Sequence, residues 1–296
     1  MNLKHVRLFW ILAAAIAAVL FQRDLVAIEE DEPGNGDRVF TRSFLGPISE
    51  KSVTYSICLP KDYHEGGKHY AVIYHLHGAG GDHTSQNDII IDSLYQAVAA
   101  DLVPPVILVF PNGYDNSMWA DSRDGSKPAE TNVVWELIRH VDSTYRTLPS
   151  SEFRIIQGSS MGGYGAAALA AKYPELFNVC LMFDGALHDW DSLSERRKNI
   201  ASEIFGNSES YYDRFSPWRN TSLNVGRIRH RVSYRMVVGA LKEFNQEYRR
   251  HLEGLGLDVE YIQTGCDHNL PCLMQETNLQ NFEFISQNSG LSSQSK

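Results

Sequence analysis

Positive charge is scarce in this sequence: 27 Lys and Arg residues stand against 36 Asp and Glu residues, for a formal net charge of −9. A chain with this balance has no global attraction for nucleic-acid phosphates, so we expect no nucleic-acid partner. Cysteine is scarce too, and 4 residues are too few for a small disulfide scaffold. The chain also has no HExxH motif and no CxxC pair, so we expect neither a catalytic metal nor a cofactor.

Internal repeats and low-complexity tracts are missing before the polar residues 287–296 (QNSGLSSQSK), which we interpret as a tail. With 43% hydrophobic and 21% charged residues, the composition is that of an ordinary globular protein. A disordered or collagen-like chain is thereby excluded.

A hydrophobic run long enough to span a bilayer is missing as well. The run at residues 8–21 has 14 uncharged residues, whereas a membrane-spanning helix needs about 20. Lys4 and Arg7 precede this run and the small residue Ala27 follows it, which is typical of a secretory signal peptide. We therefore predict a signal peptide at residues 1–27 of a secreted or periplasmic protein. An uncleaved membrane anchor is the alternative, and without one we expect no stable membrane partner.

The segment at residues 28–37 (IEEDEPGNGD) is acidic and contains proline and glycine, so we interpret it as a solvated linker. No similar segment interrupts residues 38–286. A stretch of about 250 residues fits one large domain, and we predict one there.

Short β-rich runs alternate with helical patterns throughout this domain. Several runs, such as VILVF and VCLMF, are continuously apolar, which suits strands covered on both faces. The alternation predicts an α/β fold with a doubly wound, mostly parallel sheet and ligands at the carboxyl ends of its strands. Strands are predicted at 39–44, 52–59, 70–76, 106–110, 153–157, 179–183, 234–238 and 259–263, and helices at 89–101, 132–145, 161–173, 243–255 and 276–285.

The first candidate site is the turn GSSMGG at residues 158–163, between a predicted strand and a predicted helix. Small residues let the backbone reverse sharply and present the hydroxyl of Ser160 above the sheet, at a helix N-terminus that favours negative charge. We predict that Ser160 is a nucleophile. An incidental turn or a phosphate cradle is the weaker interpretation, because no lysine follows as a P-loop requires.

The second candidate is the loop HGAGG at residues 77–81, after a buried strand. Acyl transfer develops negative charge on a carbonyl oxygen, and backbone N–H groups on a glycine-rich loop can approach it closely. We predict an oxyanion hole formed by the amides of Ala79 and Met161. His77 is expected to orient this loop rather than to act as a base.

The third candidate is GCDH at residues 265–268, after the last predicted strand. An imidazole can remove the proton of Ser160 near neutral pH and return it to a leaving group. His268 follows Ser160 along the chain, as the histidine of an α/β-hydrolase follows its serine, so we predict that His268 is the general base.

Five motifs then carry a family resemblance: YHLHGAGG, FPNGYDNSMWADS, GSSMGGYGAAALA, YPELF and the GCDH turn occur in the order and spacing of one family. The chain resembles the esterase family of α/β-hydrolases that includes S-formylglutathione hydrolases, tributyrin esterases, feruloyl and acetylxylan esterases, and mycolyltransferases. The resemblance covers about residues 40–284. It implies an α/β-hydrolase fold, with Ser160 as nucleophile, His268 as histidine, and Ala79 and Met161 at the oxyanion hole.

The sequence differs from this family at the position of the triad's acid. The family usually places Asp about three residues beyond the glycine that follows the seventh strand, where this chain has Lys242. Glu243 offers a carboxylate one position later, and Glu serves as the acid in some α/β-hydrolases. We predict Glu243 as the acid, with Asp184, at the end of the preceding strand, as the alternative.

Further predictions concern the surroundings of this site. Cys266 and Cys272 bracket His268, and either a disulfide that rigidifies the loop or two unpaired thiols fits the sequence. Trp119 and Tyr164 fall near predicted loop ends, so we expect them to line a substrate pocket.

We therefore predict a serine carboxylic ester hydrolase that takes a small-molecule short-chain, aryl or sugar ester through an acyl-enzyme intermediate. An acyltransferase that uses the same serine is one alternative. A catalytically impaired binding homologue is the other, because Lys242 occupies the usual acid position.

Overall fold

A computed structural model describes residues 39–277 and 279–293 of the chain. The signal peptide or anchor predicted at 1–27 and the linker predicted at 28–37 lie outside the described residues. In the described part, no helix has the length and apolar character needed to cross a membrane.

One eight-stranded sheet organises the domain, with the strand order β1-β2-β4-β3-β5-β6-β7-β8. The pairs β1·β2 and β2·β4 are antiparallel, and all other neighbouring strands are parallel. Each strand overlaps one of the predicted segments. The strands are β1 (Val39–Leu45), β2 (Ser52–Cys58), β3 (Val72–Leu76), β4 (Ile107–Pro111), β5 (Arg154–Ser159), β6 (Val179–Phe183), β7 (Ser233–Val238) and β8 (Val259–Gln263).

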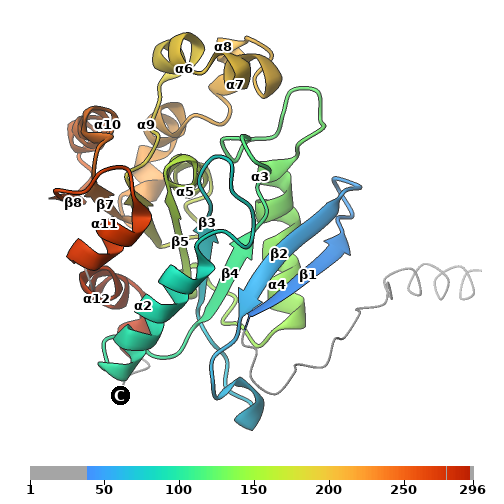
Figure 1. Ribbon diagram of the computed structural model, residues 1–296, viewed down its shortest axis with the longest axis vertical. Helices are drawn as coiled ribbons and strands as arrows, with labels where there is room; N and C mark the ends of the chain where they lie inside the picture. Colours follow the sequence, from blue (N-terminus) through green and yellow to red (C-terminus); the bar gives the residue numbers. More distant parts are fainter. Residues whose placement is uncertain (1–38, 278, 294–296) are drawn as a thin grey trace, which may run out of the picture. The chain divides into compact units, whose positions relative to one another are not determined.

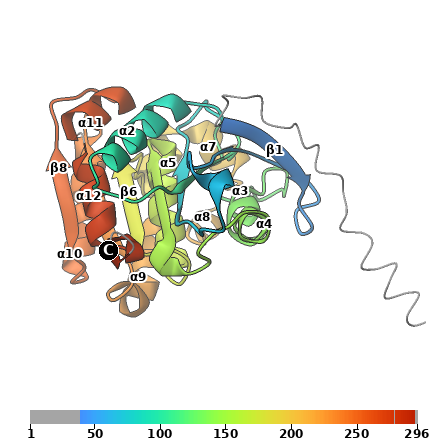
Figure 2. The same cartoon turned by 90° about the horizontal axis from the view of Figure 1, so that it is seen from below.

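Helices cover both faces of this sheet (Figures 1 and 2). Alternate residues of one strand enter different cores: Val72 and Tyr74 pack in one cluster and Ile73 in the other. This burial on both sides explains the continuously apolar runs and confirms the doubly wound arrangement. The core with Ile73 receives α2 (Asn87–Ala99), α11 (Leu270–Thr277) and α12 (Gln280–Gln287), and the opposite core receives α4 (Ile138–Thr144), α5 (Met161–Lys172), α9 (Pro217–Ile228) and α10 (Lys242–Gly254).

The segment between β6 and β7 carries four helices, of which α6, α7 and α8 lie together at the top of the view in Figure 1. The residue before each of three helices caps it, because the side chains of Asp189, Ser208 and Ser216 accept hydrogen bonds from backbone N–H groups of the first turns. These caps fix where the three helices begin. The helices are α6 (Trp190–Arg196), α7 (Lys198–Glu203), α8 (Glu209–Tyr212) and α9.

Two predicted helices differ in detail from the structure. The helix predicted at 132–145 is preceded by α3 (Ala129–Thr131) and begins with the π-helical segment Asn132–Leu137. The helix predicted at 276–285 is two helices, α11 and α12. Leu291 is buried in the core beside α12, so packed residues continue into the predicted tail. Short 3-10 helices occur at Tyr63–Glu65, Ser151–Phe153 and Gly290–Ser293.

Candidate active site

Ser160 occupies the sharp turn between β5 and α5, the serine turn at residues 158–163. Its backbone has φ 55° and ψ −117°, a conformation that residues other than glycine rarely adopt. Two backbone hydrogen bonds hold Ser160 in this conformation: Ser160 N donates to Phe183 O at 2.9 Å, and Ser160 O accepts from Ala186 N at 2.9 Å. The turn is therefore held by backbone hydrogen bonds to the residues at and beyond the end of β6.

Glycines around Ser160 are required by close backbone contact. A Cβ atom at Gly162 would overlap the carbonyl group of Leu76, and one at Gly158 would overlap the carbonyl of Gly162. A Cβ atom at Gly163 would lie 2.8 Å from the Cα of Gly185. The three glycines of the GSSMGG motif are thus steric requirements of this turn.

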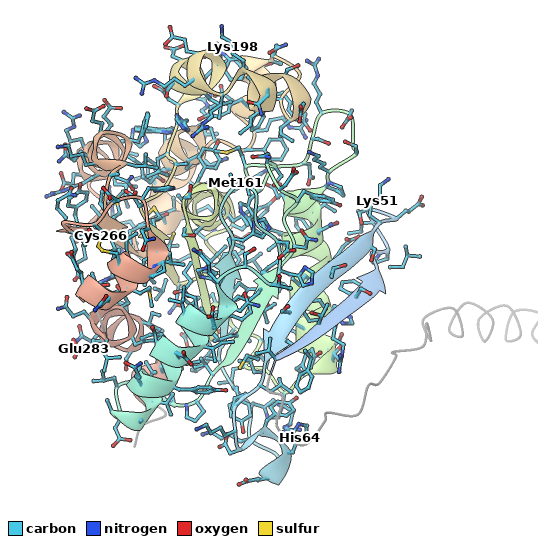
Figure 3. The ribbon with its side chains drawn as sticks, viewed as in Figure 1. Lys51, His64, Met161, Lys198, Cys266 and Glu283 are labelled. Carbon is cyan, nitrogen blue, oxygen red and sulfur yellow. A yellow bond between two sulfur atoms is a disulfide. The ribbon has the colours of Figure 1, made fainter. Side chains whose placement is uncertain are left out.

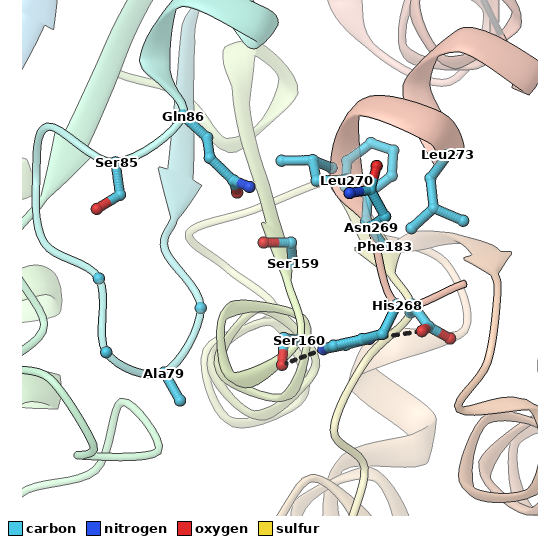
Figure 4. Close-up of a pocket in the computed structure, with 14 residues that line it drawn as sticks. Ala79, Ser85, Gln86, Ser159, Ser160, Phe183, His268, Asn269, Leu270 and Leu273 are labelled. Atoms are coloured by element: carbon cyan, nitrogen blue, oxygen red, sulfur yellow. Dashed lines mark hydrogen bonds and ion pairs between the residues drawn. The ribbon is translucent and has the colours of Figure 1, made fainter. Parts of the chain in front are cut away.

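Three side chains meet beside this turn. His268 Nε2 lies 2.8 Å from Ser160 Oγ, and His268 Nδ1 lies 2.6 Å from Asp184 Oδ2 (Figure 4). The side chain of Asp184 is 1% exposed and that of His268 is 43% exposed. Because Asp184 accepts a hydrogen bond from Nδ1–H, Nε2 is the acceptor that faces the Ser160 hydroxyl. The arrangement has the geometry of a Ser-His-Asp triad.

The carboxylate that reaches His268 is Asp184, and the preference for Glu243 is wrong on this point. Asp184 Oδ1 accepts from the backbone N–H groups of Gly239 at 2.9 Å and Leu241 at 3.0 Å. The turn after β7 therefore presents backbone amides to the site rather than a side chain. Glu243 lies exposed in the first turn of α10, and no hydrogen bond joins it to His268 in the described part of the chain.

On the other side of Ser160 lies the glycine-rich loop at residues 78–81 (Figure 4). A Cβ atom at Gly78 would lie 3.4 Å from Ser160 Cβ, which shows how closely this loop approaches. The amides of Ala79 and Met161 donate no hydrogen bond to any other described residue. Both predicted donors thus remain available beside the Ser160 hydroxyl, as an oxyanion hole requires.

His77 orients this loop through hydrogen bonds, as expected from the sequence. Its Nε2 accepts from Gly113 N at 3.0 Å, so the neutral ring carries its proton on Nδ1, which donates to Gly78 O at 2.8 Å. The Gly78 carbonyl and the Ala79 N–H belong to one peptide plane, so this bond fixes where that N–H points. Burial lowers the pKa of His77, which favours the neutral ring that this arrangement needs.

A cavity of about 360 Å³ adjoins these groups. Phe183, Leu270 and Leu273 give it an apolar wall, while Ser85, Gln86 and Asn269 contribute polar groups. In Figure 4, Gln86 extends from the start of α2 toward Leu270. The sequence offered no signal for Ser85 or Gln86, whereas Leu270 and Leu273 follow His268 at helical spacing.

The prediction that Trp119 and Tyr164 line this pocket is wrong. Their side chains are 1% and 0% exposed, and neither residue borders the cavity. Trp119 instead donates from Nε1 to His77 O at 3.2 Å and packs against Gly165. Both aromatic residues belong to the core beneath the site.

One cluster of potential metal ligands occurs in the part of the chain that the structure describes, formed by Cys266, Cys272 and Glu276. The two sulfur atoms are joined in a disulfide. A disulfide offers no thiolate, the form in which cysteine binds metals, so this cluster is no site for a metal cofactor.

Comparison with known proteins identifies a family and relatives that match parts of the domain. The Esterase family model, described as "Putative esterase", matches residues 47–248. The chain is 34% identical to Esterase Rv1288 of Mycobacterium tuberculosis (strain H37Rv) over 125 residues, which are 40% of this chain and 26% of that protein. It is 26% identical to an endo-1,4-beta-xylanase/feruloyl esterase of Xylanibacter ruminicola over 178 residues, which are 56% of this chain and 24% of that protein. The chain thus spans about a quarter of the length of these relatives.

Solved structures share the fold at low sequence identity. A ferulic acid esterase superposes with TM-score 0.68 and 21% identity, over 84% of this chain and 98% of that one. The S-formylglutathione hydrolase FrmB of Staphylococcus aureus has TM-score 0.69 and 16% identity, over 83% of this chain and 98% of that one. MPT51 of Mycobacterium tuberculosis has TM-score 0.62 and 16% identity, over 84% and 99%. The predicted α/β-hydrolase fold is confirmed.

Proposed function

Because the chain belongs to the Esterase family, we propose that it is a serine carboxylic ester hydrolase that works through an acyl-enzyme intermediate. The observation that carries this proposal is the continuous hydrogen-bonded row Ser160–His268–Asp184, with bonds of 2.8 and 2.6 Å. Each member has the chemistry its place requires: a hydroxyl to attack, an imidazole to take the proton, and a buried carboxylate to orient the imidazole.

In the proposed first half-reaction, Ser160 Oγ attacks the ester carbonyl carbon while His268 Nε2 takes its proton. Asp184 keeps the Nδ1–H tautomer and stabilises the imidazolium that forms. The amides of Ala79 and Met161 donate to the oxygen that becomes negative. His268 then returns the proton to the alkoxy oxygen, and the alcohol leaves.

In the proposed second half-reaction, the same groups act on water. His268 removes a proton from a water molecule that attacks the acyl carbon, and the oxyanion is again bound by the two amides. His268 then returns the proton to Ser160 Oγ as the intermediate collapses, which releases the carboxylic acid and restores the Ser160 hydroxyl.

The proposed substrates are short-chain, aryl or sugar esters. The apolar wall of Phe183, Leu270 and Leu273 supports a small acyl or aryl group, and the amide groups of Gln86 and Asn269 offer hydrogen bonds to a polar part of the ester. The names of a feruloyl esterase and an S-formylglutathione hydrolase among the relatives agree with this class. An acyltransferase would use the same residues with an alcohol in place of water.

We also propose that the protein is exported with the help of residues 1–27. The Cys266–Cys272 disulfide supports this, because disulfides persist in oxidising compartments such as the periplasm or the cell exterior.

Hydrolysis of short p-nitrophenyl esters by the protein lacking residues 1–27 tests the proposal. We expect Ser160→Ala to abolish turnover. Ser143→Ala, which removes an exposed hydroxyl from α4, is the matched control and should leave turnover unchanged. Equal turnover by Ser160→Ala and the parent protein would reject the assignment. Transfer of the whole acyl group to an added alcohol, with no free acid released, would favour the acyltransferase.

A further inference from the structure

A disulfide closes the loop that carries His268. Cys266 and Cys272 are bonded across a sequence separation of 6 residues, and the bond lies at the start of α11 (Figure 3). Cys266 is buried, whereas Cys272 is half-buried. Of the two interpretations that the sequence left open, the structure therefore has the covalent pair.

The loop inside this ring, the histidine loop at residues 267–271, begins with exposed residues and ends with the first residues of α11. Asp267, His268 and Asn269 are all exposed. Three local hydrogen bonds involve its backbone: Asn269 N donates to Asp267 O at 2.7 Å, Asn269 Oδ1 accepts from Cys272 N at 2.9 Å, and Asn269 O accepts from Leu273 N at 3.1 Å. The start of the loop packs against the turn that holds Asp184, since a Cβ atom at Gly239 would lie 2.7 Å from Asp267 O.

The segments that flank the loop are anchored independently of the disulfide. On one side, β8 pairs with β7 in the sheet. On the other, Leu273 of α11 packs in the core beside α2, as does Leu270 near the end of the loop itself. Breaking the S–S bond therefore leaves both flanks in place and frees chiefly the exposed residues between them.

We propose that the Cys266–Cys272 disulfide is a positioning element for His268, and that its reduction lowers turnover in an enzyme that stays folded. This inference rests on the proposed esterase function. His268 must keep two short hydrogen bonds at once, to Ser160 and to Asp184, and a displacement of about 1 Å in such a group costs about a hundredfold in rate.

The reductant is a dithiol. One of its thiolates attacks Sγ of Cys272, the more exposed of the two cysteines, and Cys266 leaves as a thiolate that takes up a proton. The second thiol of the reagent then attacks the mixed disulfide and releases Cys272. Two electrons and two protons pass to the protein, which gains two thiols, and the reagent becomes a cyclic disulfide.

The test compares oxidised and dithiothreitol-reduced protein, both lacking residues 1–27, with the double variant Cys266→Ser/Cys272→Ser. Alkylation and intact mass count the thiols, and near-UV circular dichroism reports the fold. We expect reduction to lower kcat by about tenfold to a hundredfold with KM changed less than about twofold, and reoxidation to restore it. The rate of Ser160 labelling by a fluorophosphonate should fall in parallel. The double variant should show the reduced value and no response to dithiothreitol.

Three results would overturn the inference: an unchanged kcat in protein shown to be reduced, a KM effect without a kcat effect, or loss of the near-UV spectrum on reduction, which would make the bond a support of the fold instead. Failure of the proposed function has a different signature. In that case the oxidised protein itself neither hydrolyses esters nor reacts with the fluorophosphonate.

Discussion

The serine turn and the histidine loop carry the two ends of one hydrogen bond, yet the protein holds them by different means. The serine turn is built of glycines pressed against the backbone of neighbouring strands, where no side chain fits. The histidine loop is exposed, and its ends are joined by a disulfide. Steric necessity therefore positions the serine, whereas a covalent link and a buried carboxylate position the histidine.

The largest expected effect comes from breaking the serine turn. Gly162→Ala places a Cβ atom against the carbonyl of Leu76, so the turn cannot form without moving β3. We expect a loss of more than about 4 kcal/mol in the free energy of unfolding, measured by urea denaturation. The matched control is Gly226→Ala in α9, where a Cβ atom meets nothing within 4 Å; it should stabilise by about 0.5–1 kcal/mol. Equal stability of the two variants would contradict the steric account.

The second prediction distinguishes the roles of the carboxylates of Asp184 and Glu243. Asp184→Asn keeps the shape of the side chain but can no longer hold the Nδ1–H tautomer of His268, so kcat should fall about 10³–10⁴-fold. Glu243→Gln, on the exposed first turn of α10, should change kcat less than about twofold. Initial rates with p-nitrophenyl acetate decide. A larger loss in Glu243→Gln than in Asp184→Asn would restore the acid first favoured from the sequence.

A smaller effect is expected behind the oxyanion loop. His77→Ala removes the donor to Gly78 O, which frees the peptide that carries the Ala79 N–H. We expect kcat to fall about tenfold to a hundredfold, since the loss of an entire oxyanion donor costs about 10²–10³-fold. KM should stay within about twofold. His69→Ala, at an exposed histidine, is the control, and an unchanged kcat in His77→Ala would mean that the loop keeps its own geometry.

The smallest expected effect is the dependence of folding stability on pH. His75 lies on β3, two positions before His77, and burial lowers its pKa to about 3 from 6.5. As the pH falls below about 6.5 the unfolded chain binds this proton first, so stability is full above that pH and is lost progressively toward pH 3. Between pH 7 and pH 5 this amounts to about 2 kcal/mol at most.

Urea unfolding at the two pH values measures this loss. We expect His75→Asn to lose less stability than the parent protein over the interval, whatever its absolute stability. The exposed His230 supplies the control variant, His230→Gln, which should follow the parent. An unaltered pH dependence in His75→Asn would show that other groups carry the acid sensitivity.

The sequence predicted most where a local requirement determines the residue. Strands such as β4 and β6 were found because burial on both sides leaves continuous apolar runs, and Ser160 was found because its turn needs glycines at close backbone contacts. The acid was ranked wrongly because its place depends on contacts between distant elements. Asp184 and the amides of Gly239 and Leu241 are more than 50 positions apart, and no local pattern records that they meet.

The pocket was predicted poorly for a related reason. Trp119 and Tyr164 are near loop ends in the sequence, but large aromatic rings stabilise most when buried, and both lie in the core. Gln86, which does border the cavity, precedes α2 in a backbone conformation with φ 61°. Neither its residue type nor its spacing marks such a position in the sequence.

The central claim, that Ser160 is a nucleophile activated by His268, is tested most directly by mapping the adduct of a fluorophosphonate on the intact protein. Digestion and mass spectrometry should find one phosphonylated residue, Ser160, and labelling should slow in Asp184→Asn. A protein that remains unmodified, or that carries the adduct on another residue, would contradict the account.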